Sequence, residues 1–182
     1  DHIDFISRLQ RCIEDGGREI DCVYRGFAKT TIGELSTLWA VLTGRKKFAL
    51  ILGADADAAS NNLDSLKAEL ESNELLLDDW PEACYPVRCL DGRPQRCATQ
   101  THDGKLTKIS WTAEEIILPS TGGICDGACI RTKGFLAANR GSTYKDASTG
   151  EQRRPDWVFI DDPQTDQSAN SPAQCQRRID KL

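Results

Sequence analysis

The feature that most constrains the fold is a run of five consecutive apolar residues, Phe48–Leu52. A strand with one face in water alternates apolar and polar residues, whereas a strand covered on both faces by helices is apolar throughout. Segments with the helical spacing of apolar residues lie on either side of this run, at residues 32–42 and 59–70. We therefore expect an α/β protein, with a mostly parallel sheet flanked by helices.

Length and composition indicate one soluble globular domain. The chain has 182 residues, of which 39% are apolar and 28% charged, and Gly and Pro together number 21. These values exclude a collagen, a low-complexity disordered chain and a small disulfide scaffold. No apolar run approaches the ~18 residues of a membrane span, and the N-terminus is acidic where a signal peptide is basic, so neither membrane insertion nor secretion is expected. Because the sequence contains no Met, we expect the chain to be a fragment of a longer protein.

The eight cysteines favour free thiols over a metal site. No two of them form a Cys-x-x-Cys pair, and the only histidines are His2 and His102, so a zinc site would need scattered ligands. A domain of this size buries a core without disulfides. Reduced cysteines in a cytosolic protein are therefore expected.

Charge is distributed unevenly along the chain. Residues 55–82 carry nine acids and one base, a net charge of −8 within a total of −5, which leaves +3 for the rest. The acids are expected on the solvent face of a helix. Residues 83–160 hold eleven Lys and Arg against eight Asp and Glu, which falls well short of the basic stripe of a dedicated nucleic-acid binder. Composition alone therefore gives no indication of DNA binding.

Hydrophobic spacing and turn residues predict the order of elements. The expected helices span residues 3–13, 32–42, 59–70 and 171–182. The expected strands span residues 20–24, 48–52, 124–132 and 156–163, with two more or a hairpin in 105–118. Residues 83–104 and 139–155 are expected to be irregular. The last helix is predicted from the capping-box pattern that begins at Ser171.

The predicted strand 20–24 leads through a tight loop into a helix, and the loop ends in a Lys-Thr pair. In the pattern G-x-x-x-x-G-K-[ST], a lysine at position 29 needs glycines where Val23 and Ala28 stand. The physical requirements are still met, because backbone N–H groups at a helix N-terminus attract phosphates. Lys29 would reach the β- and γ-phosphates, and the Thr30 hydroxyl would ligate Mg²⁺. The alternative is an ordinary strand-to-helix turn with an exposed lysine.

A second motif combines an apolar strand, Trp157–Ile160, with Asp161 and Asp162. In open α/β sheets ligands bind at the carboxyl ends of strands, where this segment delivers two carboxylates. Asp161 can hold Mg²⁺ through its water shell, and Asp162 can accept a proton from the attacking water or orient it. An apolar strand followed by Asp in a turn is also common as plain structure. The order of the two motifs, a Walker A candidate followed by a Walker B candidate, makes them support each other.

These segments resemble a known family. Residues 24–31 (Tyr-Arg-Gly-Phe-Ala-Lys-Thr-Thr) resemble the deviant Walker A of the large terminase subunits of tailed bacteriophages, which has an early arginine and ends in Gly/Ala-Lys-Ser/Thr. Residues 154–164 resemble the Walker B segment of one terminase branch, and residues 48–82 resemble the second strand–helix unit of the ATPase domain. The resemblance covers roughly residues 20–182.

The resemblance implies a P-loop NTPase (ASCE type) and a Mg²⁺-dependent ATPase that drives double-stranded DNA into a viral procapsid. The family works as a homo-oligomeric ring on the portal protein, with a small terminase subunit that selects the DNA, in the host cytoplasm. Residues 1–182 would be a partial ATPase domain with Walker A at 24–31 and Walker B at 157–162. The coupling motif and the nuclease domain of the family lie beyond Leu182, so no nuclease activity is expected of this chain.

Site residues follow from the resemblance by position. Thr30 and Asp161 would serve the metal, Asp162 would be the catalytic acid, and Arg25 would act on the γ-phosphate like an arginine finger, with a salt bridge as the alternative. Many relatives have Glu in place of Asp162, whose reach to the water is one methylene shorter. The nucleotide-binding residues would be Arg25, Gly26, Phe27, Ala28, Lys29, Thr30 and Thr31.

Two other functions remain open at this point. One is another P-loop ATPase of RecA or helicase type, which shares the two motifs. The other is a non-catalytic prophage remnant that binds nucleotide without turnover, as Ala28 and Asp162 suggest. The adenine pocket is sought around residues 5–20. The residues considered for DNA contact are Arg131, Lys133, Arg140 and Lys145.

Overall fold

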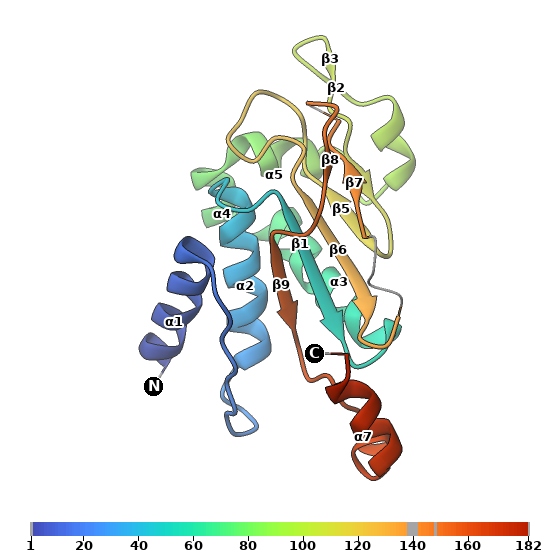
Figure 1. The fold of residues 1–182 in the computed structure, drawn as a ribbon. Coiled ribbons are helices and arrows are strands. Elements are labelled where there is room, and N and C mark those ends of the chain that lie inside the picture. The colour runs from blue at the N-terminus through green and yellow to red at the C-terminus, as the bar shows by residue number, and fades with distance from the viewer. Residues whose placement is uncertain (1, 138–141, 148, 182) are drawn as a thin grey trace.

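The structure, a computed structural model, describes residues 2–137, 142–147 and 149–181 and has an α/β fold around a mixed sheet (Figure 1). The sheet has five strands in the order β4-β5-β6-β1-β9. Strand β1 is parallel to β6 and to β9, whereas β5 and β4 join antiparallel beyond β6. The strands are β1 (Phe48–Gly53), β4 (Ser110–Trp111), β5 (Glu115–Ile117), β6 (Cys129–Gly134) and β9 (Trp157–Ile160). The expected α/β sheet flanked by helices is confirmed, but the sheet is mixed and not mostly parallel, because two of its four strand pairs are parallel and two are antiparallel.

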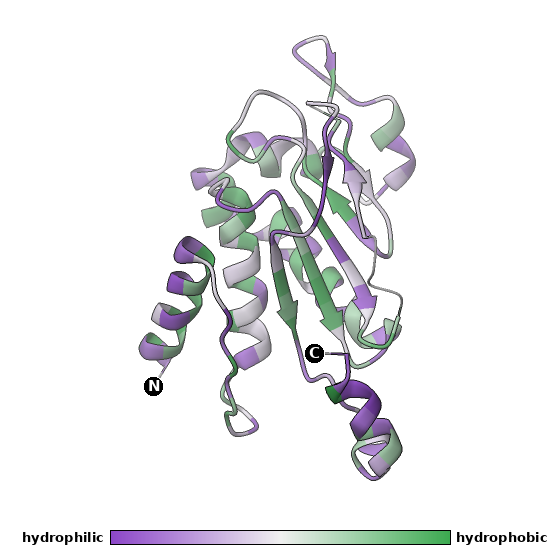
Figure 2. Ribbon diagram, in the orientation of Figure 1, coloured by the Kyte–Doolittle hydropathy of each residue, from purple (hydrophilic) through white to green (hydrophobic). Residues whose placement is uncertain are grey.

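Strand β1 lies inside the sheet, between β6 and β9, and its apolar residues suit this position because both of its faces are covered. All six are buried, and the strand is hydrogen-bonded on both sides, so that Leu50 lies opposite Arg131 in β6 and Val158 in β9. Figure 2 shows β1 and β9 as hydrophobic ribbons inside a largely hydrophilic periphery. The apolar run 48–52 therefore predicted a strand that is buried on both faces, and this prediction is confirmed.

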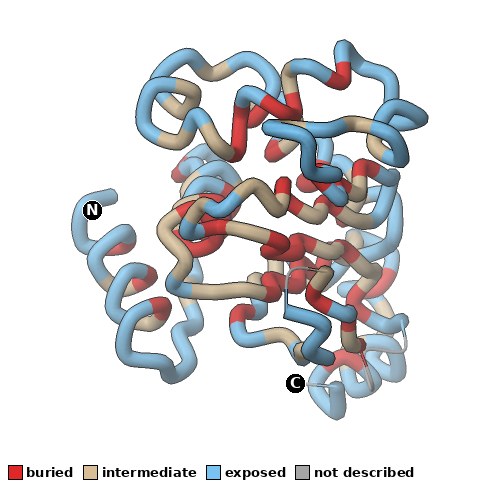
Figure 3. The backbone as a smooth tube through the Cα atoms, turned by 90° about the horizontal axis from the view of Figure 1, so that it is seen from above, coloured by how far each residue is buried: buried red, intermediate tan, exposed pale blue. Residues whose placement is uncertain are grey.

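Helices pack on the face of the sheet to which Ala49 and Ile51 belong. The helices of this layer are α1 (His2–Asp15), α2 (Lys29–Leu42), α3 (Ala56–Ser72), α4 (Glu74–Asp79) and α5 (Pro81–Arg88). Asp55 caps the N-terminus of α3, because its Oδ1 accepts a hydrogen bond from the Ala58 N–H at 2.9 Å. Helix α1 packs on the outer side of α2, with its buried positions turned inward (Figure 3). This layer contains most of the hydrophobic core.

The other face of the sheet carries two smaller apolar clusters. One joins Phe48 and Cys129 to Tyr144 of the hairpin β7 (Tyr144–Lys145) and β8 (Gln152–Arg153). The other joins Leu50 and Leu52 to Phe135, just after β6. Alternation of side chains along β1 sends successive residues to opposite faces, which accounts for the division.

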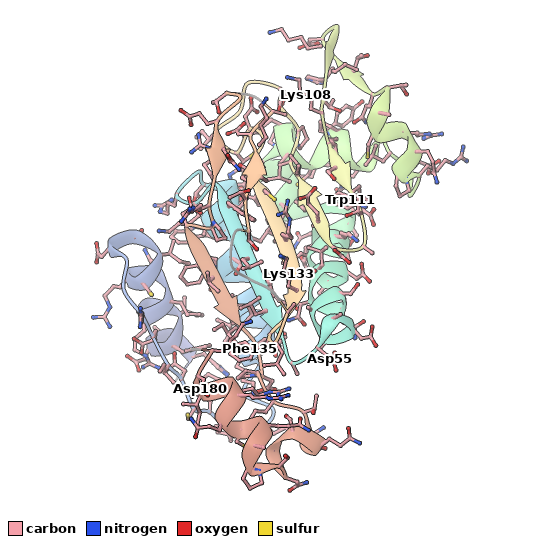
Figure 4. The ribbon with its side chains drawn as sticks, turned by 45° about the vertical axis from the view of Figure 1, so that its right-hand side comes forward. Asp55, Lys108, Trp111, Lys133, Phe135 and Asp180 are labelled. Atoms are coloured by element: carbon pink, nitrogen blue, oxygen red, sulfur yellow. The ribbon has the colours of Figure 1, made fainter. Side chains whose placement is uncertain are left out.

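Small elements lie beyond the two ends of the sheet. At one end are η1 (Pro94–Ala98), β2 (Thr101–His102) and β3 (Lys105–Leu106), and past the carboxyl end of β9 are α6 (Asp166–Ala169) and α7 (Pro172–Ile179). Figure 4 shows Lys108 at the first end, and Asp55, Phe135 and Asp180 together at the second. No helix within the described residues is long and apolar enough to cross a membrane.

The strand expected at residues 20–24 is wrong. Residues 16–24 form neither helix nor strand, and Ile20 is 87% exposed. The segment is held to α1 instead, because the Arg8 guanidinium pairs with Glu19 at 2.9 Å and with Asp21. Paired acids and an exposed isoleucine leave this segment without the buried face that a sheet strand needs. Within the described residues, β9 is consequently an edge strand of the sheet.

Two of the segments expected to be irregular contain regular structure. Within residues 83–104, α5 buries Ala83, Cys84 and Val87 against α3. Residues 139–155 include the β7–β8 hairpin, in which Tyr144 lies opposite Arg153. Both segments bury side chains against the domain, so tertiary packing outweighs their turn-rich composition.

Several predicted elements have different limits, and the strand expected at 156–163 is confined to Trp157–Ile160. The strand expected at 124–132 begins at Cys129, because Asp126 accepts hydrogen bonds from the backbone N–H groups of a turn at residues 121–123. The helix expected at 171–182 ends at Ile179. Ser171 makes no side-chain cap there, and the capping box forms instead in α6, between Thr165 and Ser168.

Candidate functional site

The loop before α2 presents an uncapped helix N-terminus. Ala28 is the residue that precedes the helix, and it adopts the left-handed conformation with φ 61° and ψ 27°. No side chain caps α2 there, so the first backbone N–H groups have no side-chain acceptor. Left-handed backbone is the conformation that glycine adopts without cost. The backbone at the last position of the loop is thus glycine-like, although the residue is alanine.

Phe27 anchors this loop to α1. Its side chain is buried, and its ring packs edge-on against Phe5 and Tyr24 with centroids 5.6 and 5.5 Å apart. His2 lies against the same ring at 4.5 Å, and its Nε2 is 3.1 Å from the Phe27 carbonyl oxygen. The aromatic contacts fix the loop from the side opposite the sheet, while the neighbouring Arg25, Gly26 and Ala28 stay exposed.

Asp161 lies directly against the first turn of α2. Its backbone N–H donates to the Leu52 carbonyl at 2.9 Å, which continues the pairing of β9 with β1. The Thr30 hydroxyl lies 3.0 Å from both carboxylate oxygens of Asp161, and Asn62 Nδ2 of α3 lies 3.5 Å from Oδ2. Burial raises the pKa of Asp161, and the Thr30 hydrogen bond opposes that change. Three elements thus hold one carboxylate at the carboxyl edge of the sheet.

Asp162 meets the neighbouring residue of α2. Its carboxylate forms an ion pair with the Lys29 ammonium, and its backbone has φ 37°, in the left-handed region. Lys29 is half-buried, whereas Asp162 is largely exposed. Lys29 and Thr30 are therefore each in contact with one of two acids that lie more than 130 positions away in the sequence.

The structure brings together four of the residues singled out from the sequence: Lys29, Thr30, Asp161 and Asp162. The loop residues Arg25, Gly26 and Ala28 are exposed next to them, Phe27 is buried beneath, and Thr31 is exposed on the first turn of α2. Around residues 5–20, where the adenine pocket was sought, α1 turns Phe5, Leu9 and Ile13 into the core.

Sequence reasoning missed two polar residues of this site, Asn62 and Glu34. Asn62 is 8% exposed and occupies the apolar face of α3 beside Ala59 and Leu66, so a polar residue in an apolar stripe was the available signal. Glu34 is 7% exposed. Leu35 is 43% exposed, although it is one of the apolar residues whose helical spacing predicted the helix at 32–42. The buried face of α2 is therefore rotated from the expected one.

Glu34 is the most perturbed acid of this region. Burial raises its pKa to about 7, and the negative charges of Asp161 and Glu69 add to the effect. Its Oε1 is buried and has no hydrogen-bond partner among the described residues. A buried acceptor without a donor is rare in folded proteins.

The donor set at this edge suits magnesium bound together with phosphate. Among the described residues no group of three or more His, Cys, Asp and Glu side chains is arranged to hold a metal ion. Magnesium does not need such a cage, because it keeps several waters and binds one or two protein oxygens plus substrate phosphates. The Thr30 hydroxyl, the Asp161 carboxylate and the unpartnered oxygen of Glu34 are oxygen atoms of the required kind.

Two of the four residues considered for DNA contact, Arg131 and Lys133, take part in interactions within the fold. Arg131 pairs with Glu115 and stacks over Phe48 at 5.3 Å, and Lys133 Nζ lies 3.0 Å from the Ser142 hydroxyl. Lys145 is exposed on β7, and Arg140 lies outside the described residues. The eight cysteines, considered above for zinc, are all free thiols.

Comparisons of the chain with protein families, with curated proteins and with solved structures gave no match. The features of the chain that point to a function lie at this edge of the sheet. They are an uncapped helix N-terminus, a lysine and a threonine on its first turn, and two carboxylates that face them.

Proposed function

We propose that this chain binds ATP with Mg²⁺ at the N-terminus of α2 and hydrolyses it as a P-loop-type ATPase. The observation that carries the proposal is the contact of Lys29 and Thr30 with Asp162 and Asp161, across more than 130 residues of sequence. A cation, a hydroxyl and two carboxylates around free helix N–H groups are the parts that phosphoryl transfer requires.

Each residue has a distinct task in this proposal. Lys29 leaves Asp162 for the β- and γ-phosphates when nucleotide binds, since an ammonium between two anions goes to the larger charge. Thr30 supplies its hydroxyl oxygen to Mg²⁺, and Asp161 accepts hydrogen bonds from the waters around it. Bound Mg²⁺ neutralises the charge that develops on the phosphates.

Asp162, released from Lys29, would orient the attacking water and accept its proton as the water oxygen bonds to the γ-phosphorus and the bond from that phosphorus to the bridging oxygen breaks, which gives ADP and phosphate. Arg25, exposed beside the loop and without an ion pair to any described residue, is free to reach the γ-phosphate. Backbone N–H groups from Ala28 onward hold the phosphates. Phe27 keeps the loop attached to α1 while the phosphates bind.

The biological role we propose is that of a large terminase ATPase domain, which packages double-stranded viral DNA into a procapsid. This rests on the resemblance of residues 24–31 and 154–164 to that family. The partners would be the small terminase subunit, the portal protein and further copies of the same subunit in a ring, in the host cytoplasm.

The first experiment is an equilibrium titration of the chain with a fluorescent ATP analogue and Mg²⁺, run for wild type, Lys29→Ala and Asp161→Ala. Lys105→Ala is the matched control, because Lys105 is exposed on β3 at the opposite end of the sheet. We expect Lys29→Ala to weaken binding at least tenfold, about 1.4 kcal/mol, and Lys105→Ala to leave it unchanged. A folded wild-type chain that binds no nucleotide, or binds it equally well without Lys29, refutes the proposal.

Turnover separates the remaining alternatives. Released phosphate under single-turnover conditions supports an ATPase, whereas binding without release supports a non-catalytic remnant. In the product of the whole gene, a packaging motor is expected to hydrolyse ATP faster when portal-bearing procapsids and DNA are present. A helicase-type ATPase responds to nucleic acid alone.

A further inference from the structure

Glu34 occupies the same side of α2 as Thr30, the residue that contacts Asp161. Residues four apart on a helix lie on the same side of it, so Glu34 follows Thr30 by one turn on this side of α2. Helix α2 packs against α3, which supplies Asn62 to Asp161 and places Glu69 within electrostatic reach of Glu34. Glu34 is therefore a buried acid directly behind the proposed magnesium site.

The environment of Glu34 lacks what a carboxylate normally requires. Its Oε1 is buried without a hydrogen-bond donor, and no described basic residue forms an ion pair with it. Asp161 and Glu69, the charges that act on it most, are both negative. Leaving such an acceptor unpaired destabilises the folded chain, whereas an apolar residue at this position would bring no such penalty. A donor or a positive charge at this place would remove the cost.

We propose that Glu34 is a positioning residue of the magnesium site, whose carboxylate accepts a hydrogen bond from a water that the cation carries. This inference rests on the proposed function, since it places the cation at Thr30 and Asp161. Magnesium retains several of its waters in protein sites, and each of these is a strong donor. The double positive charge also offsets the three carboxylates Glu34, Asp161 and Glu69.

Residues behind the direct ligands hold those ligands and tune the metal, and their loss typically lowers metal affinity 10- to 100-fold. Glu34 and Asn62 differ in whether their polar atoms have a partner among the described residues. The Asn62 amide contacts Asp161 already without metal, so it orients that carboxylate in either state. Glu34 Oε1 has a partner only when a donor enters the site.

The test measures metal affinity and not activity. Mn²⁺, which substitutes for Mg²⁺ and is read by electron paramagnetic resonance, is titrated into the chain saturated with a non-hydrolysable ATP analogue. The variants are Glu34→Leu, which removes the acceptor, and Glu34→Gln, which keeps one acceptor oxygen. Glu71→Gln on the exposed side of α3 is the control for charge removal. Nucleotide affinity is measured in parallel with excess chelator, and the fold of each variant is checked by circular dichroism.

We expect Glu34→Leu to weaken Mn²⁺ binding at least tenfold, Glu34→Gln to weaken it less, and Glu71→Gln to leave it unchanged. Metal-free nucleotide affinity should stay within twofold in all of them, which a general structural defect would not allow. Equal Mn²⁺ affinity in wild type and Glu34→Leu overturns the inference while the proposed function stands. A wild-type chain that binds no nucleotide overturns both. If Glu34→Leu does not fold, the comparison is made with Glu34→Gln, and unchanged Mn²⁺ affinity there overturns the inference.

Discussion

Glu34 makes the stability of this protein depend on pH in a defined direction. Its pKa is about 7 in the folded chain, against an ordinary value of 4.5, because it is buried and lies near Asp161 and Glu69. The folded chain therefore holds the Glu34 proton more tightly than the unfolded chain does. The contribution of Glu34 to the free energy of unfolding is fully present below pH 4.5, and it is lost as the pH rises through about 7.

The size of the effect follows from the difference between the two pKa values. Each pKa unit corresponds to about 1.4 kcal/mol, so the full difference amounts to about 3 kcal/mol, of which about 2 kcal/mol falls between pH 5 and pH 8. Burial also raises the pKa of Asp161, which acts in the same direction. The contribution of Glu34 is isolated by Glu34→Gln, which has no proton to lose in this range.

The measurement is urea unfolding followed by tryptophan fluorescence, at pH 5 and pH 8, in buffer with a chelator. Wild type should lose about 2 kcal/mol more of its free energy of unfolding than Glu34→Gln between these two pH values. Glu71→Gln, which removes an exposed acid of α3, should follow wild type. Glu69→Gln should show a smaller pH dependence than wild type, because one of the charges that raise the pKa is gone. Parallel pH profiles of wild type and Glu34→Gln would refute the reasoning.

Substitutions at three further positions test the structure around the site, each by its free energy of urea unfolding. Thr37→Val should cost about 1–3 kcal/mol and Thr37→Ser much less, because the buried Trp157 Nε1–H donates to the Thr37 hydroxyl at 2.9 Å; equal losses would contradict this. Ala28→Gly should stabilise by up to about 1 kcal/mol, since relief of the left-handed strain exceeds the entropy of glycine in the unfolded chain; a destabilised variant would contradict it. Gly53→Ala should cost about 2 kcal/mol or more, because the new Cβ would lie 2.6 Å from the backbone nitrogen of Ala59, and a neutral result would show that α3 shifts.

The parts of the site that follow from chain order were predictable from the sequence. Apolar strands were expected at residues 48–52 and 156–163, and in open α/β sheets ligands bind at the carboxyl ends of strands. That reasoning, with the order of the two motifs, assigned Thr30 and Asp161 to one site, and their contact is present in the structure.

The strand expected at residues 20–24 shows where local pattern is insufficient. Ile-Asp-Cys-Val-Tyr has the composition of a strand, but a strand also needs a partner with free backbone groups and an apolar surface to cover. Here Arg8 binds Glu19 and Asp21 and holds the segment at α1. Ion pairs between residues 11 and 13 positions apart leave no periodic trace in the sequence, so the pattern could not reveal them.

The rotation of α2 about its own axis, which decides the residues it buries, was unpredictable for a different reason. The helix is apolar on most of its circumference: Leu35, Leu38 and Leu42 mark one side, whereas Gly33, Thr37 and Val41 mark another. Gly33 decides between them, because a side chain there would collide with the Phe159 ring of β9 at 2.1 Å. Once that close approach turns Gly33 toward the sheet, Glu34 is carried into the interface with α3 and Leu35 toward solvent. The burial of an acid behind the candidate magnesium site is thus a consequence of helix–strand packing at one glycine, and substitution of that glycine should disturb Glu34 and the stability of the sheet edge together.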